Sequence, residues 1–231
     1  VIINVDDLGL SEAVNEAVIR LAEHGRIGAS SYMVGGAISD YDIGQLSELN
    51  VDVGLHLDLT GIFASSLQGS LKAIIIASYL RRLDSRQVSE IIKQQLDAFE
   101  DRFNQPPVFI DGPQHIHQFP IIRQCLKDEL KVSYARSVSS IYARATTPLV
   151  NDFKSWVIYL LGGKAWKQLC MENNILTNDG FGGVYGFDTS YSDLAMLWDK
   201  WLDSAPLSSN LSPGLYTQLN KLEDSGTYAQ Y

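Results

Sequence analysis

The sequence predicts an α/β fold, a single domain in which mainly parallel strands form a sheet or a barrel. Short apolar runs rich in β-branched residues alternate with longer segments whose apolar residues recur at helical spacing, and this alternation is typical of βαβ units. The length of 231 residues suits one hydrophobic core. With 45% hydrophobic residues, the chain has enough apolar surface to offset the entropy lost on folding. We therefore expect residues 1–231 to form one domain.

Strands and helices are predicted in regular alternation over the first half of the chain. The predicted strands are apolar runs at residues 1–5, 26–34, 51–57 and 108–111. Helical spacing predicts helices between Ser11 and Gly25 and over residues 38–49, 85–103 and 121–130. Ser11 and Ser85 suit N-cap positions, and Gly25 suits a helix end. A long loop containing glycine and serine is expected after the third strand.

The pattern is looser in the second half of the chain. Residues 132–135 are interpreted as a further strand. An aromatic helical stretch runs through Trp156 and Trp166. Trp198 and Trp201 also recur at helical spacing, and we expect such aromatic residues to pack into the core. No internal repeat or low-complexity linker interrupts the chain.

The charge balance argues against two classes of partner. The chain has 27 acidic and 18 basic residues, a net charge of −9, and its basic residues form no cluster beyond Arg81 and Arg82. Nucleic acids and anionic membrane surfaces require concentrated positive charge. No strongly apolar stretch approaches the roughly 20 residues of a membrane span. We expect a small neutral or cationic substrate, with no nucleic-acid and no membrane partner.

Cysteine usage favours a cytoplasmic setting. Cys125 and Cys170 are the only cysteines, and both lie in apolar runs of helical character, where a free thiol behaves as a small hydrophobic group. Two cysteines cannot form a thiolate zinc cage.

The chain opens at Val1 in an apolar strand without a methionine, so we expect it to be trimmed there. We leave truncation of the C-terminal end open.

Two adjacent carboxylates, Asp6 and Asp7, follow the first predicted strand and precede a helix. Active sites of barrels and doubly wound sheets lie at this end of the strands. One carboxylate could bind a metal while the other acts as a base. The alternative is a helix N-terminus whose acidic residues interact with the helix dipole, and the pair alone favours that interpretation.

Histidine and aspartate residues also occur at two other predicted strand ends. His56 and Asp58 lie at the end of the third strand, and Asp111, His115 and His117 lie at the end of the fourth. Residues two apart on an extended segment share a face, about 6–7 Å apart. Three of the four histidines of the chain belong to these strand ends, which makes chance clustering the weaker explanation.

This set of residues predicts an open metal site. A carboxylate and two imidazoles leave coordination positions for water and substrate. A metal there would lower the pKa of its bound water, and a second carboxylate could accept the proton. The predicted reaction is hydrolysis of an amide or an ester. His24 lies at the end of the first predicted helix, where a polar ring favours the helix terminus, and it receives no catalytic role.

The residues around this predicted site resemble a known family, the YdjC-like carbohydrate deacetylases, which include chitooligosaccharide deacetylases. The resemblance rests on three segments in the family's order, residues 4–11, 54–60 and 111–120. It implies a distorted (β/α) barrel, a divalent metal ion, Mg²⁺ or Zn²⁺, and hydrolysis of the amide C–N bond of an N-acetylated amino sugar. By position, it makes Asp6 the general base and makes Asp7 and His56 metal ligands.

Two positions depart from the family pattern. The pattern Asp-x-His-x-His-x-His places its first histidine, the expected ligand, at Pro113, and the histidine of a C-terminal His-Pro-Gly, the expected general acid, at Ser212. In one interpretation, His115 becomes the third ligand through a bend at residues 112–113, and His117 or a water completes the proton relay. In the other, the chain is a carbohydrate-binding pseudoenzyme with impaired turnover.

Two kinds of phosphate-related function are less consistent with the sequence. A phosphoacceptor signalling domain also has an acid pair after its first strand, but it needs an aspartate after the third strand, where His56 stands. The glycine-rich residues 181–186 lack the Lys-Ser/Thr of a phosphate loop. The resemblance makes this segment a substrate-side loop, with Phe181 and Tyr185 as expected contacts. A small carbohydrate is the expected partner, and a homodimer is left open.

Overall fold

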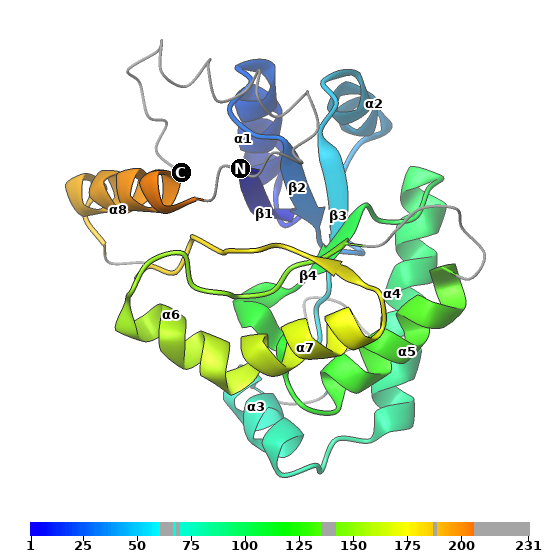
Figure 1. The fold of residues 1–231 in the computed structure, drawn as a ribbon. Coiled ribbons are helices and arrows are strands. Elements are labelled where there is room, and N and C mark those ends of the chain that lie inside the picture. The colour runs from blue at the N-terminus through cyan, green and yellow to red at the C-terminus, as the bar shows by residue number, and fades with distance from the viewer. Residues whose placement is uncertain (61–66, 68–69, 135–141, 187–188, 206–231) are drawn as a thin grey trace.

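A computed structural model of the chain describes residues 1–60, 67, 70–134, 142–186 and 189–205. Its described strands form one parallel sheet in which each strand pairs with the next along the chain (Figure 1). In sheet order the strands are β1 (Asn4–Leu8), β2 (Ala29–Tyr32), β3 (Asp52–His56), β4 (Phe109–Asp111), β5 (Tyr142–Ala143) and β6 (Leu176–Thr177). This confirms the predicted α/β class. Sequential order is that of a (β/α) barrel, whereas a doubly wound sheet reverses its order.

Helices connect and cover these strands (Figure 1). Helices α4 and α5 pack against each other beside the sheet, and α6 and α7 follow one another across the lower front of the view. The helices are α1 (Glu12–Glu23), α2 (Asp40–Glu48), α3 (Leu71–Tyr79), α4 (Ser85–Phe103), α5 (Ile122–Tyr134), α6 (Phe153–Ile158), α7 (Lys164–Glu172) and α8 (Tyr191–Ser204). A 3₁₀ segment spans Pro113–Gln118, and a π-helical turn, Tyr159–Gly163, joins α6 to α7.

Several of these helices have an N-cap residue whose side chain accepts hydrogen bonds from backbone N–H groups of the first turn. The predicted N-cap Ser11 is confirmed, because its hydroxyl accepts a hydrogen bond from the backbone N–H of Val14. The predicted N-cap Ser85 is wrong by one residue. The carboxylate of Asp84 accepts from the backbone N–H groups of Arg86 and Gln87, and Ser85 is the first residue of α4.

The predicted strand at residues 132–135 is wrong over residues 132–134, because α5 continues through Tyr134, and residue 135 lies outside the described residues. Buried Ile122, Leu126 and Leu130 recur at helical spacing and hold this helix against the core, while Val132 lies on its exposed side. The next strand, β5, has only two residues, too few to produce an alternating pattern. The loop expected after the third strand contains α3, which begins after the N-cap Ser70.

The core is formed where the helices meet the sheet. Phe99 of α4 is fully buried and stacks on Phe103, and both rings contact Tyr32 of β2 edge-on. Trp166 and Trp201 are buried as predicted, and Trp198 packs edge-on against Trp201. Trp156 is instead exposed, and its Nε1 donates to Oδ1 of Asn151. No helix among the described residues is both long enough and apolar enough to cross a membrane.

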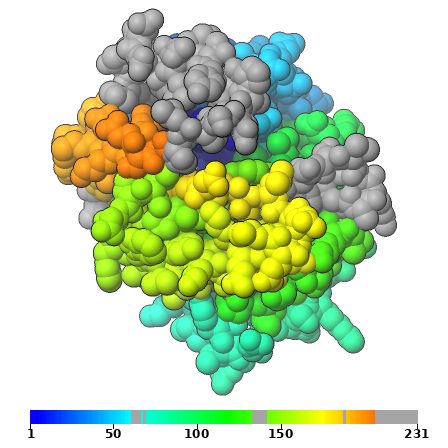
Figure 2. Space-filling model, viewed as in Figure 1, coloured from blue at the N-terminus to red at the C-terminus, as the bar shows by residue number. Residues whose placement is uncertain are grey.

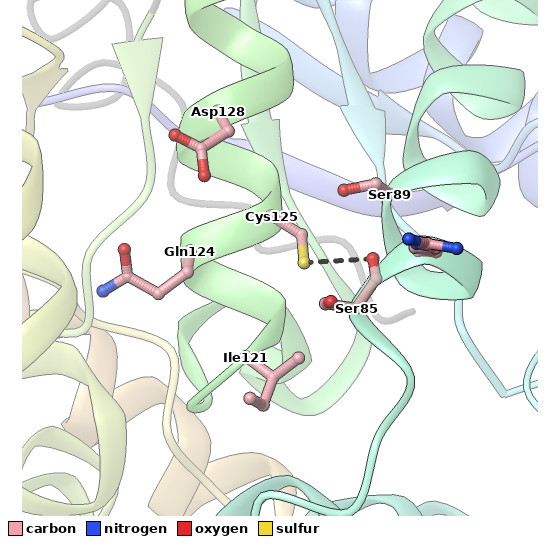
Figure 3. A pocket seen from close by; sticks show the side chains of 7 residues that line it. Ser85, Ser89, Ile121, Gln124, Cys125 and Asp128 are labelled. Atoms are coloured by element: carbon pink, nitrogen blue, oxygen red, sulfur yellow. Dashed lines mark hydrogen bonds between the residues drawn. The ribbon is translucent and has the colours of Figure 1, made fainter.

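Both cysteines are free, buried thiols. Burial raises the pKa of Cys125 and raises that of Cys170 to about 12. Cys125 Sγ lies 3.5 Å from the carbonyl oxygen of Ser85, beside a pocket of about 310 Å³ between α4 and α5 (Figure 3). The pocket is lined by Ser85, Arg86, Ser89, Ile121, Gln124, Cys125 and Asp128, none of which belongs to the predicted site. These thiols therefore belong to the packing between helices.

The burial of Phe99 predicts a large stability effect. Phe99→Ala should lower the free energy of unfolding by about 3–5 kcal/mol, because it removes a fully buried ring and leaves a cavity. Phe153→Ala is the matched control, since 82% of Phe153 is exposed, and it should change the free energy by less than about 0.5 kcal/mol. Urea denaturation measures both. Equal effects would contradict the described core.

Candidate functional site

Four strand ends bring charged side chains to one edge of the sheet. Asp6 and Asp7 lie in β1, His56 and Asp111 are the last residues of β3 and β4, and Arg144 directly follows β5. His56 and Asp111 are register partners in the β3–β4 ladder. The backbone N–H of Arg144 donates to the carbonyl oxygen of Ile110, 2.9 Å away, which aligns Arg144 with the same edge. Because the strands are parallel, these side chains converge.

An irregularity in β1 allows both adjacent aspartates to reach this edge. Consecutive side chains on a regular strand point to opposite faces. The β1–β2 register shifts between Val5 and Leu8, and Asp7 has a left-handed backbone conformation with φ of 67°. As a result, the Asp6 carboxylate contacts Arg144 and the Asp7 carboxylate contacts His56.

The imidazole of His56 is held between two carboxylates. Nδ1 of His56 lies 2.6 Å from Oδ1 of Asp111, and both side chains are buried. Nε2 lies 3.3 Å from Oδ1 of Asp7, a carboxylate that is partly exposed. Burial lowers the pKa of His56, but the charges and hydrogen bonds of the surrounding aspartates outweigh burial and raise it to about 10. In the metal-free protein His56 is therefore protonated at neutral pH.

Arg144 is a member of the site that sequence reasoning missed. Its guanidinium donates to both carboxylate oxygens of Asp6 at 3.0–3.1 Å and forms a close ion pair with Oδ2 of Asp111. The guanidinium carbon lies 5.5 Å from the centre of the Phe181 ring. Burial lowers the pKa of Arg144, and Asp111 and Asp6 more than offset this, so the pKa is raised. The two-residue strand before Arg144 gave no pattern that could have marked it.

The segment after β4 turns sharply and separates the two other predicted histidines. Gln114 and His115 both have left-handed backbone conformations, with φ of 46° and 61°. His115 packs edge-on against Phe181, and within the described part of the chain its Nδ1 has no hydrogen-bond partner. His117 is fully buried, its Nε2 lies 2.8 Å from the carbonyl oxygen of Arg144, and its ring packs against Trp166.

Burial keeps both of these histidines neutral. The pKa of His115 is lowered to about 3 by burial and by the positive charge of Arg144. Burial also lowers the pKa of His117 to about 3, against the opposing hydrogen bond to the Arg144 carbonyl. His56 is thus charged in the metal-free site while His115 and His117 are not.

The donor atoms of the site suit a divalent cation. Among the described residues, one group has ligand atoms that all lie within 4.8 Å of one another, and it consists of Asp6, His56 and Asp111. Carboxylate oxygens and imidazole nitrogens bind Mg²⁺, Zn²⁺ and similar ions. Metal-binding histidines are commonly oriented by a carboxylate on their second ring nitrogen. Asp111 contacts Nδ1 of His56 in this way, which leaves Nε2 available to bind a metal.

The predicted ligand set therefore divides in the structure. Of the predicted ligands Asp7, His56 and His115, only His56 belongs to the group of three. Asp7 lies outside that group but contacts Nε2 of His56 at 3.3 Å. Of the two expected substrate contacts, Phe181 lies beside Arg144 and His115, and Tyr185 lies 6.5 Å from the ring of Trp201 in α8. These roles stay predictions. Ser212 lies outside the described residues.

The pKa of His56 predicts a pH-dependent stability for the metal-free protein. The folded value of about 10 exceeds the ordinary 6.5, so the protonated imidazole stabilises the fold. This contribution is complete below pH 6.5 and is lost as the pH rises toward 10. The stability advantage of the natural protein over His56→Gln should therefore shrink between pH 6 and pH 10 in urea denaturation. His24→Gln, which changes an exposed histidine outside the site, serves as the control. A constant advantage over His56→Gln would contradict the prediction.

Comparison with solved structures supports the fold. A crystal structure from Enterococcus faecalis V583, of a protein proposed to cleave cellobiose phosphate, matches 96% of this chain and 88% of its own chain with a TM-score of 0.62. The two sequences are 14% identical, so the similarity concerns the fold alone.

Comparison of sequences identifies the family. The chain is 28% identical over 129 residues to a chitooligosaccharide deacetylase of Enterobacter sp. (strain 638). The aligned region covers 52% of this chain and 51% of that relative, about half of its length. A family model of YdjC-like proteins matches residues 1–227. Because this match spans nearly the whole sequence, the chain belongs to the family of YdjC-like proteins.

Proposed function

We propose that the protein is a metal-dependent carbohydrate deacetylase that hydrolyses the N-acetyl group of an amino sugar or a chitooligosaccharide-like substrate. Membership of the YdjC-like family and the similarity to a protein named as a chitooligosaccharide deacetylase support the proposal. One observation carries it. His56 is oriented by buried Asp111, with Asp7 on its other nitrogen and the Asp6 carboxylate close by. These groups supply oriented metal donors and a separate base at one sheet edge.

Asp7 and His56 are the residues proposed to hold a divalent ion, Mg²⁺ or Zn²⁺. Nε2 of His56 and Oδ1 of Asp7 lie close enough to serve one ion, and Asp111 keeps the ring in place through Nδ1. His56 must lose its second ring proton to bind a metal. When bound, the ion would polarise the amide carbonyl and acidify a water molecule. His115 was predicted as the third ligand. Its neutral Nδ1 has no hydrogen-bond partner among the described residues, which suits this role chemically.

Asp6 is the proposed general base. Its side chain is 43% exposed, so a water molecule can approach it, while Arg144 holds both of its oxygens. The carboxylate accepts a proton from the water that attacks the acetamide carbon, and acetate and a free amine result. Phe181 packs against Arg144 and His115, and this location beside the proposed base supports its proposed role as a sugar contact.

His117 was predicted to protonate the leaving amine, and its surroundings favour a different role. The side chain is fully buried, and Nε2 is hydrogen-bonded to the backbone of Arg144. We propose that His117 holds the chain at Arg144. Among the described residues, the structure assigns no other group to protonation of the amine.

A carbohydrate-binding pseudoenzyme is the second candidate function. Pro113 occupies the position of an expected ligand and offers no donor atom. In addition, Arg144 engages Asp6 and Asp111, two members of the group that could hold a metal. Such a site could bind the sugar without turnover.

Acetate release separates the two functions. With Mg²⁺ or Zn²⁺ added, the natural protein should release acetate from chitobiose or chitotriose, and Asp6→Asn should lower kcat by about 10²- to 10⁴-fold because it removes the base. Asp97→Asn, on the exposed face of α4, should retain the natural rate. Binding of the sugar without acetate release under any of these metals would establish the pseudoenzyme instead.

Metal titration tests the ligands independently of turnover. In calorimetry with Zn²⁺ or Mg²⁺, His56→Ala should abolish measurable binding, and Asp111→Asn should weaken it by about 10- to 100-fold because it releases the ring orientation. His24→Ala serves as the control. Equal metal uptake by His115→Ala and the natural protein would remove His115 from the proposed ligand set.

A further inference from the structure

The carboxylate of Asp6 is held in an asymmetric way. Oδ1 receives hydrogen bonds from Asn4 Nδ2 at 2.6 Å, from Ser31 Oγ at 3.3 Å and from both terminal nitrogens of Arg144. Oδ2 receives one hydrogen bond, from Nη2 of Arg144 at 3.1 Å, among the described residues. Oδ2 therefore keeps a free lone pair while Oδ1 is saturated.

Arg144 is itself held by four other parts of the fold. Its backbone N–H donates to the carbonyl of Ile110 in β4. Its carbonyl oxygen accepts from His117 Nε2 at 2.8 Å and from Trp166 Nε1 at 3.2 Å. The ring of Phe181 lies against the guanidinium, and only 13% of the Arg144 side chain is exposed. These hydrogen bonds hold the backbone of Arg144, while its guanidinium lies against Phe181 and between the carboxylates of Asp6 and Asp111. The guanidinium is therefore placed to orient the Asp6 carboxylate.

We infer that Arg144 is a positioning residue, which fixes Asp6 so that Oδ2 faces the water and accepts its proton. The inference rests on the proposed deacetylase function, in which Asp6 is the base. Arg144 also pairs with Asp111, so it places one positive charge between two carboxylates that would otherwise repel each other. A lysine cannot reproduce this contact, because its ammonium is a point charge without the planar fork of arginine.

The effect of losing Arg144 should fall on kcat. Asp6 would turn toward Asn4 and Ser31, and a misplaced base costs roughly 100-fold in rate. Arg144→Ala should therefore lower kcat by about 100-fold and change KM by less than about threefold. Arg144→Lys should recover only a small part of the loss. Arg102→Ala, which removes another arginine–aspartate pair far along α4, should leave kcat unchanged.

Chemical rescue distinguishes positioning from general structural damage. Guanidinium at millimolar concentration should restore kcat of Arg144→Ala at least tenfold, while urea, a neutral molecule of the same shape, should not. Natural kcat in Arg144→Ala would overturn the inference, and so would the absence of rescue in a folded variant. If Arg144→Ala does not fold, the activity of Arg144→Lys tests the inference instead. Full activity of Arg144→Lys would overturn it.

Crystal structures of the variant separate this inference from the proposed function. In Arg144→Ala without guanidinium, the Asp6 carboxylate should be rotated away from its position in the natural protein, and a guanidinium soak should return it. An unmoved carboxylate would overturn the positioning role whether or not the protein releases acetate. If the natural protein releases no acetate, the proposed function is wrong. The position of the Asp6 carboxylate in the variant would still test the role of Arg144.

Discussion

The convergence of three carboxylates at one sheet edge is the constraint on which the rest of the site depends. Asp6, Asp7 and Asp111 arrive there because parallel strands end together, and Asp111 is fully buried. Unpaired charges in such a place are costly. His56 and Arg144 provide the compensating positive charge, each in contact with two of the three aspartates. The fold around the site serves to keep these five side chains together.

A divalent ion would change this balance in a defined way. In the metal-free protein, His56 carries a proton because of its aspartate neighbours. A metal bound through Nε2 would replace that proton, so the ion and the proton would compete for the same ring. Arg144 keeps its charge in either state, because its pKa is raised. The positive charge of His56 could therefore be exchanged for that of a metal ion, which suits its proposed role as a ligand. The positive charge of Arg144 is permanent, which suits its proposed role as a positioning residue.

Strong local patterns were predictable from the sequence, and contacts across the sheet were not. The α/β class, the N-cap Ser11 and the convergence of Asp6, Asp7 and His56 followed from apolar runs and the residues that end them. Arg144 was missed because the strand before it has only two residues. A strand was predicted over residues 132–135, whereas α5 continues through Tyr134. The left-handed turn at Gln114 and His115 was not predicted, because non-glycine residues rarely adopt this conformation and no local pattern marks it.

The central claim is that His56 and Asp7 hold a metal ion at the carboxyl edge of the sheet. Anomalous diffraction from crystals soaked in Zn²⁺ tests it most directly, because the peak locates the ion and identifies every ligand. The expected result is a peak beside Nε2 of His56 and the carboxylate of Asp7, with Arg144 still on Asp6. Absence of a peak there, with Arg144 and His56 keeping their contacts to the aspartates, would contradict the claim and favour a carbohydrate-binding pseudoenzyme.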